Sequence, residues 1–109
     1  MKMDQVLSMV GIAAKAGKVV SGEFATENAV KSRKAYLVMI ATDSSDNTKK
    51  KNHDMCNFYH VNCYEYGTKD TLGRCIGKEY RSSLTITDAN LANVIQSKIK
   101  TATGQEQQN

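Results

Sequence analysis

Proline and tryptophan are absent from this 109-residue sequence, and aromatic residues make up only 6% of it. Without proline, no residue forces a predicted helix or strand to break. No apolar run approaches the roughly 20 residues that a membrane-spanning helix needs, and residues 1–4 lack the apolar stretch of a secretory signal. These absences exclude a helical membrane span and predict a protein that is neither secreted nor bound to a membrane.

Cysteine is scarce as well. The three cysteines are Cys56, Cys63 and Cys75, and no two of them form a C-x-x-C pair. An odd number without pairing fits a reducing compartment better than a disulfide framework. We therefore expect a cytoplasmic protein whose cysteines serve as small buried hydrophobic residues.

The length suits a single domain, because two domains would each be too small to bury a sufficient core. We expect this domain to span residues 1–100 and the polar residues 101–109 to form a disordered tail with almost nothing to bury. Fifteen Lys and Arg against eleven Asp and Glu give a net charge of +4, which fits an anionic partner. Cations cluster in residues 15–34 and 49–51, although such runs are as often only solvated helix faces.

Hydrophobic periodicity, capping residues and turn residues predict helices that alternate with strands. The expected helices are residues 4–16, 23–33, 48–59, a short helix from Thr68 to Gly77, and a last helix from Asp88; the expected strands are residues 19–20, 36–41, 61–66 and 83–87. This order is typical of an α/β fold, and we predict a three-layer α/β/α sandwich around a central four-stranded, mixed sheet.

Two strands and the last helix carry more specific expectations. Residues 36–41 are continuously apolar, which predicts a strand buried on both faces at the centre of the sheet. Residues 83–87 alternate between polar and apolar side chains, which predicts a strand buried on one face only. In the last helix, the apolar side chains expected to be buried are Leu91, Val94, Ile95 and Ile99.

Enzymatic and metal sites find little support. The glycine spacings around Gly17-Lys18 and Gly77-Lys78 do not match a phosphate-binding loop. His53, Cys56, His60 and Cys63 are residue types that zinc selects, yet the last would lie in a strand and Cys56 is placed to be core. A metal protein or a cysteine enzyme built on these residues is therefore the weakest hypothesis. We expect no enzymatic activity, no cofactor, no metal and no small-molecule substrate.

Two loops remain as candidate binding elements. Residues 18–24 lead into a helix N-terminus, whose free N–H groups suit a phosphate. Residues 77–81 combine two cations with Tyr80, which can stack on an unpaired base. If the loops meet at one edge of the sheet, they form a plausible RNA site. The alternative has equal weight on residue types alone: Phe24 belongs to the core, Tyr80 is incidental and the cations are merely solvated.

Several segments together resemble the kink-turn RNA-binding ribosomal-protein superfamily. The similar segments are residues 17–22 (GKVVSG), 34–43 (KAYLVMIATD) and 72–79 (LGRCIGKE). Residues 47–51 (NTKKK) and 56–59 (CNFY) resemble more narrowly its small bacterial YlxQ-type branch. The resemblance extends over roughly residues 3–100 and implies the same sandwich. It also implies that the protein grips a kink-turn, a sharply bent RNA, with the helix start after the first strand and the loop before the last strand.

The resemblance carries over unevenly to individual residues. The family's first-element glycine corresponds to Gly22, but its asparagine-glutamate pair falls at Phe24 and Ala25, and its lysine falls at Asn28. Phe24 and Ala25 have no polar side-chain group for a base edge, so the family's usual readout cannot operate residue for residue. The second element carries over better, since the family's short loop corresponds to residues 78–80.

We therefore predict a cytoplasmic RNA-binding protein that recognises structured, kink-turn-like RNA, with ribosomal RNA the expected partner and ribosomal proteins further candidates. Gly22 is expected to donate its N–H and allow close approach, Thr26 and Asn28 to contact base edges, Tyr80 to stack, and the cations to bind phosphates. The predicted site residues are Lys18, Gly22, Thr26, Asn28, Lys31, Lys78, Tyr80 and Arg81. The alternative is a protein-interaction module that has lost kink-turn recognition, which an exposed Phe24 in an apolar patch would favour.

Overall fold

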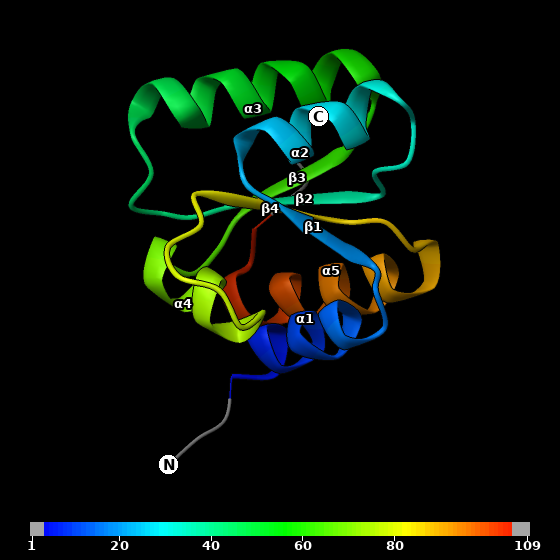
Figure 1. Cartoon of the computed structure of the whole chain (residues 1–109), viewed down its shortest axis with the longest axis vertical. Helices are drawn as coiled ribbons and strands as arrows, with labels where there is room; N and C mark the ends of the chain where they lie inside the picture. Colours follow the sequence, from blue (N-terminus) through cyan, green and yellow to red (C-terminus); the bar gives the residue numbers. More distant parts are fainter. Residues whose placement is uncertain (1–3, 106–109) are drawn as a thin grey trace.

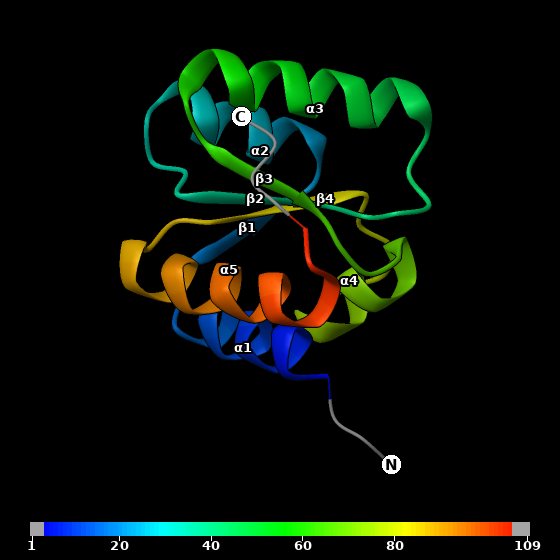
Figure 2. The same ribbon diagram turned by 180° about the vertical axis from the view of Figure 1, so that it is seen from behind.

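A computed structural model of the chain describes residues 4–105, in which helices and strands alternate (Figure 1). The helices of this part are α1 (Gln5–Lys15), α2 (Glu23–Lys31), α3 (Asp46–Tyr59), α4 (Lys69–Cys75) and α5 (Ala89–Thr103), and its strands are β1 (Val19–Ser21), β2 (Leu37–Ile40), β3 (Asn62–Glu65) and β4 (Ser83–Ile86). Helices α2 and α3 cover one face of the sheet, and α1, α4 and α5 cover the other (Figures 1 and 2). The predicted α/β/α sandwich is confirmed.

The sheet has the strand order β1-β4-β2-β3. Strand β4 runs antiparallel to both of its neighbours, whereas β2 and β3 are parallel. The sheet is therefore mixed, as predicted, and β2 is an interior strand. Because β4 runs against β2, the start of β4 lies beside the end of β2, with Ser83 opposite Ile40.

Strand β2 is fully buried because apolar clusters lie on both faces of the sheet. Leu37 and Met39 belong to the cluster under α1, α4 and α5. Val38 and Ile40 belong to the smaller cluster under α2 and α3. This alternation explains why the sequence shows a continuous apolar run in place of a period of two.

The expectation that β4 is buried on one face only is wrong. All four of its residues are buried, including Ser83 and Thr85. These two hydroxyls lie under α2, where both donate hydrogen bonds to Oγ1 of Thr26, at 3.3 and 3.1 Å. Polar side chains in an alternating strand usually face water, but here the polar side chain of Thr26 on the covering helix satisfies them.

Four of the five described helices begin with a side-chain cap, and α2 does not. The capping oxygens belong to Asp4, Ser45, Thr68 and Asp88. Helix α2 follows Gly22, which has a φ of 94° and offers no side chain. Within residues 4–105, no helix combines the length and the apolar character needed to span a membrane.

The C-terminal expectations need two corrections. Residues 101–103, predicted to be disordered, continue α5, and the Gln105 side-chain amide hydrogen-bonds the main-chain N–H and C=O of Glu65 at 3.1 and 2.8 Å. These contacts order a segment that has little apolar surface of its own. Residues 106–109 lie outside the described part of the chain. Val94 is 42% exposed instead of buried, because Ala92, Ile95 and Ile99 form the inward stripe of α5.

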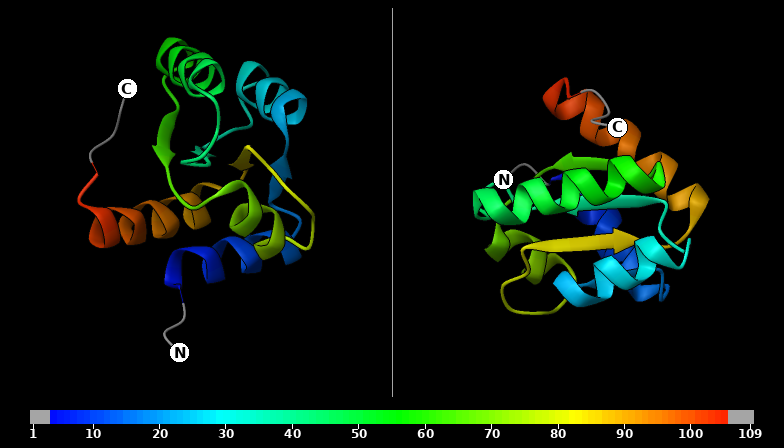
Figure 3. Two further views of the ribbon diagram at one scale, coloured as in Figure 1. Left: turned by 90° about the vertical axis from the view of Figure 1, so that its left-hand side faces the viewer. Right: turned by 90° about the horizontal axis from the view of Figure 1, so that it is seen from above.

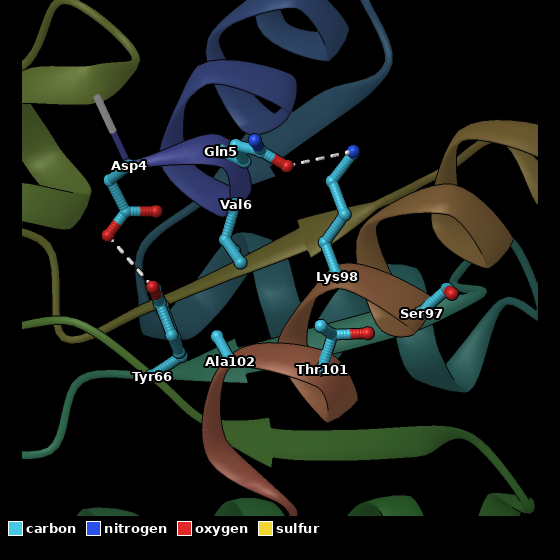
Figure 4. Close-up of a pocket in the computed structure, with 8 residues that line it drawn as sticks. All are labelled: Asp4, Gln5, Val6, Tyr66, Ser97, Lys98, Thr101 and Ala102. Carbon is cyan, nitrogen blue, oxygen red and sulfur yellow. Dashed lines mark hydrogen bonds between the residues drawn. The ribbon is translucent and has the colours of Figure 1, made fainter. Parts of the chain in front are cut away.

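A cavity of about 660 Å³ lies between the start of α1 and the end of α5 (Figure 4). At its rim, the hydroxyl of Tyr66 donates a 2.8 Å hydrogen bond to Asp4. Partial burial and this hydrogen bond raise the pKa of Tyr66 to about 12. The contact ties the start of the chain's first helix to the segment that follows β3.

The raised pKa of Tyr66, caused by burial and by this hydrogen bond, makes stability pH-dependent in the alkaline range. Below pH 10, the ordinary pKa of tyrosine, the hydroxyl is protonated in both states and the bond stabilises the fold in full. Above it the unfolded chain loses the proton first, so the free energy of unfolding falls as the pH rises toward 12. Urea unfolding should show that the wild type and Tyr66→Phe differ in their free energy of unfolding, and that this difference becomes smaller as the pH rises from 10 to 12. A difference independent of pH would contradict the assignment.

Candidate nucleic-acid interface

Residues 21–24 of the first candidate loop meet the second candidate loop at one end of the sheet. The α4–β4 loop lies beside the junction of β1 and α2, as Figure 3 shows in the view from this end. Between them is a shallow depression of about 460 Å³. Its lining comes from both segments and consists of Ser21, Gly22, Glu23, Phe24, Ala25, Tyr80, Arg81 and Ser82.

Main-chain and side-chain hydrogen bonds hold the two segments together. The N–H of Gly22 donates to the carbonyl of Ser83 at 3.0 Å. Nε of Arg81 donates to the hydroxyl of Ser21 at 3.0 Å, and a second guanidinium nitrogen donates to the Tyr80 carbonyl at 2.8 Å. The positive charge of Arg81 is therefore fixed at the rim of the depression.

Gly22 has only part of the predicted role. Its N–H is used by Ser83, so the expectation that it donates to RNA is wrong. The other part fits the structure, because an added Cβ would meet no atom within 4 Å and the space beside the glycine is open. Its φ of 94° suits glycine and strains other residues.

Two aromatic side chains stand exposed at this end. Phe24 is 85% exposed and Tyr80 is 70% exposed, so neither belongs to the core. Phe24 was not among the predicted site residues, although its position on the helix could have identified it as exposed. The buried residues of α2 include Ala29 and Val30, and Phe24 projects from the other side of that helix.

Polar and charged residues complete the surface. Lys78 is exposed in the α4–β4 loop, and Asn28 is exposed one helical turn after Phe24. Neither Lys78 nor Arg81 forms an ion pair with any acidic residue between positions 4 and 105. Gly22, Lys78, Tyr80 and Arg81 thus lie on the loops that surround this end, and Asn28 lies farther along α2.

Two predicted cations lie elsewhere. Lys18 precedes β1, and its carbonyl accepts a hydrogen bond from Thr87 at the opposite end of the sheet from Gly22. Lys31 is in the last turn of α2, where its ammonium pairs with Glu27 at 2.7 Å. The prediction that Lys18 lies at the site was wrong, because strand β1 runs across the whole sheet between Lys18 and Gly22.

Comparisons with known proteins decide the family. The model of the Ribosomal protein L7Ae/L30e/S12e/Gadd45 family matches residues 4–96. The chain belongs to this family. The RNA-binding protein YlxQ of Bacillus subtilis (strain 168) is 41% identical over 85 residues, which cover 78% of this chain and 85% of that protein. The RNA-binding protein YlxQ of Enterococcus faecium is 36% identical over 74 residues, which cover 68% of this chain and 72% of that protein.

Solved structures share the fold of this L7Ae-family chain. A structure of a protein with unknown function from Bacillus halodurans C has a TM-score of 0.87 and 32% identity, covering 90% of this chain and 99% of that one. The Giardia lamblia 15.5kD RNA binding protein has a TM-score of 0.73 at 24% identity, covering 91% and 85%, and supports the fold alone. The resemblance to the bacterial YlxQ-type branch is confirmed.

Thr26 is not a surface residue in this L7Ae-family chain, so its predicted contact with a base edge is wrong. Its side chain is completely buried and accepts the hydrogen bonds from Ser83 and Thr85. Sequence spacing placed it near Gly22, but the first turns of a helix also contain its inward face. Thr26 joins α2 to the strand that leads out of the second loop.

The substitution Thr26→Val distinguishes a structural role of Thr26 from a role in contacting RNA. Valine has nearly the same shape but gives Ser83 and Thr85 no acceptor, and leaving buried hydroxyls unpaired costs about 1–3 kcal/mol. We expect the free energy of unfolding in urea to fall by that amount, while the affinity of the folded protein for RNA stays unchanged. A loss of RNA affinity without a loss of stability would show instead that Thr26 contacts the ligand.

The residues of the metal hypothesis serve other contacts. Nε2 of His53 lies 2.9 Å from a carboxylate oxygen of Glu65, and Cys56 and Cys63 are completely buried. The hydrogen bond that the Cys63 thiol donates to Cys56, together with burial, raises the pKa of Cys63 well above the ordinary thiol value. Across residues 4–105, no three His, Cys, Asp or Glu side chains are grouped to hold a metal ion.

Cys75 does not form an active thiol either. The pKa of this half-buried thiol is raised to about 11, and burial is the main cause of the shift. A nucleophilic cysteine needs a lowered pKa, because the thiolate is the reactive form. The expectation that Cys56 and Cys63 are buried hydrophobic residues is confirmed.

Proposed function

We propose that this protein binds structured RNA at the end of the sheet where the α4–β4 loop meets the start of α2, without catalysing a reaction. The observation that carries the proposal is the pair of exposed aromatic side chains, Phe24 and Tyr80, on one depression with unpaired cations beside it. Exposed rings suit the stacking of unpaired bases, and Lys78 suits a phosphate. The two YlxQ relatives, both named RNA-binding proteins, support it.

The chemistry favours recognition by shape over recognition by base edges. The side chains of Phe24 and Ala25 have no hydrogen-bonding atoms, so the start of α2 offers mainly a ring, an open glycine and main-chain groups. A sharply bent RNA with a flipped-out base can place that base on Tyr80 or Phe24 and its phosphates near Lys78 and Arg81. The RNA class we propose is therefore a kink-turn or a bend like it.

We propose ribosomal RNA as the partner and the cytoplasm as the location, with ribosomal proteins as neighbours on the particle. Membership of a ribosomal-protein family supports the ribosome as the setting. The net charge of +4 adds a general attraction to RNA. The three unpaired thiols suit a reducing compartment.

A fluorescence titration tests the proposal. The protein is titrated against a kink-turn RNA and a matched duplex that lacks the bend, each at two salt concentrations. Tighter binding to the kink-turn at both salts supports recognition of the bent RNA. Equal binding that collapses with salt means only a basic surface, and no binding at either salt contradicts RNA binding here.

A protein-interaction module on the same fold is the second candidate, and the exposure of Phe24 favours it. The depression that Phe24 lines is not wholly apolar, however, because Ser21, Glu23 and Arg81 line it as well. A pulldown with and without ribonuclease distinguishes the two functions. Protein complexes that survive ribonuclease digestion would support the interaction module.

A further inference from the structure

The end of the sheet opposite Tyr80 carries a second candidate surface. The α1–β1 turn, the α2–β2 turn and the C-terminus of α3 are all at this end of the molecule, at the right of Figure 1 and the left of Figure 2. Main-chain hydrogen bonds of 2.9 Å connect Lys18 and Tyr36 to adjacent residues of the β4 end, Thr87 and Ile86. Residues far apart in the sequence therefore flank one strand end.

The cations of this end have no acidic partners. Lys18, Arg33 and Lys34 form no ion pair with any residue in the described range 4–105. The nearby carboxylate of Asp88 is already engaged, since it accepts the N–H of Leu91 at the start of α5. By contrast, the cations farther along α2 and α3 are neutralised: Lys31, Lys49, Lys50 and Lys51 all pair with Asp or Glu.

Exposed aromatic rings lie beside these cations. Phe58 is 75% exposed and Tyr36 is 50% exposed. Phe58 makes an edge-to-face contact with Tyr59 at 5.0 Å between centroids, and the guanidinium of Arg33 lies 6.0 Å from the centre of the Tyr59 ring. One ring holds the arginine in place, and two others remain accessible.

Backbone strain points to the same place. Within residues 4–105, Arg33 and His60 are the two residues other than glycine with positive φ, at 63° and 60°. They follow the last turns of α2 and α3, positions at which glycine is favoured because it has no Cβ. Arg33 stands at such a position in place of a glycine, which agrees with a binding role for its side chain.

We propose that this basic aromatic surface, formed by Lys18, Arg33, Lys34, Tyr36 and Phe58, binds an unpaired RNA strand. Phosphates would contact the three cations and bases would stack on the two rings, the combination that binds single strands without sequence preference. The surface is distinct from the kink-turn site proposed above, because four residues of an extended strand, about 13 Å, separate Lys18 from Gly22. An acidic protein segment would use the charge but not both exposed rings.

The test uses a fluorescein-labelled oligouridylate of about eight nucleotides, which forms neither a duplex nor a kink-turn. Arg33→Ala/Lys34→Ala is expected to weaken binding and to flatten its dependence on log salt concentration by up to about 1.4. Phe58→Ala is expected to weaken binding about 5- to 140-fold with the salt dependence unchanged. Lys98→Ala/Lys100→Ala removes the same charge from α5 and serves as the matched control, with binding expected near that of the wild type.

Circular dichroism confirms that each variant is folded before titration. Affinity for the kink-turn duplex should stay unchanged in Arg33→Ala/Lys34→Ala, so the two proposed sites can fail independently. The proposal is overturned if oligouridylate does not bind the wild type, if the control loses as much affinity as Arg33→Ala/Lys34→Ala, or if only Tyr80→Ala reduces binding. Equal displacement of the oligouridylate by polyglutamate of the same length would assign the surface to acidic proteins instead.

Discussion

Replacing Gly73 with alanine is expected to destabilise the protein and to displace the α4–β4 loop of the proposed RNA-binding site. In an exposed helix this change stabilises by about 1 kcal/mol, because alanine has the higher helix propensity. Gly73, however, lies on the α4 face that touches the α4–β4 loop, and a Cβ there would be 1.3 Å from the carbonyl oxygen of Glu79. That atom is main chain, so the loop itself has to move. Overpacking typically costs about 1–3 kcal/mol, which outweighs the propensity gain.

Two measurements check this result. Urea unfolding should give a lower free energy of unfolding for Gly73→Ala, and titration of the folded variant should give weaker binding of kink-turn RNA. Gly17→Ala is the control, because Gly17 has a φ of 74° with no neighbour within 4 Å of an added Cβ and lies at the far end of the sheet. It should lose stability while keeping RNA affinity. Unchanged stability of Gly73→Ala would mean that α4 does not pack against the loop as described.

Removing either exposed ring of the candidate interface should weaken RNA binding with little effect on stability. Stacking of a base on an aromatic side chain contributes about 1–3 kcal/mol, so Tyr80→Ala and Phe24→Ala are each expected to lower affinity about 5- to 140-fold. The salt dependence should not change, because neither ring contacts a phosphate. Since both side chains are mostly exposed, the urea midpoint should stay close to that of the wild type.

A conservative variant makes the result specific. Tyr80→Phe keeps the ring and should bind nearly as well as the wild type, whereas a role for the hydroxyl would make it as weak as Tyr80→Ala. The double variant Phe24→Ala/Tyr80→Ala reports whether one base lies between the two rings. Coupled losses support a shared base, and additive losses support two separate bases. Full affinity in both single variants would remove this surface from the proposed function.

The sequence predicts the order of elements well because each is specified locally. The apolar run of residues 36–41 is typical of a strand covered on both faces, and Thr68 caps a short helix with its own side chain. Interactions between distant segments are harder to predict. The alternation of Ser83 and Thr85 with apolar residues has the pattern of a half-exposed strand, and only the fold reveals that α2 covers the polar face with an acceptor.

The candidate site was predicted in part for a similar reason. The sequence supplies residue types, and the kink-turn family resemblance supplies their order, so Gly22, Lys78 and Tyr80 could be assigned to one end of the sheet. The sequence gives no direct measure of the direction in which a side chain on a given helix turn points. The sequence therefore predicts an exposed Thr26 and leaves Phe24 a core candidate, whereas the structure buries Thr26 and exposes Phe24. The prediction for Lys18 was wrong because residues at the two ends of a strand are close in sequence but far apart in space.

The contact between Gln105 and Glu65 has a consequence for self-association. An outer strand carries main-chain groups that can recruit a strand from another molecule, which is a common route to aggregation. On β3, an outer strand of the sheet, the side-chain amide of Gln105 already occupies the N–H and the C=O of Glu65. The opposite outer strand, β1, is only three residues long. One glutamine thus covers the Glu65 end of this outer strand and hinders the addition of a fifth strand there.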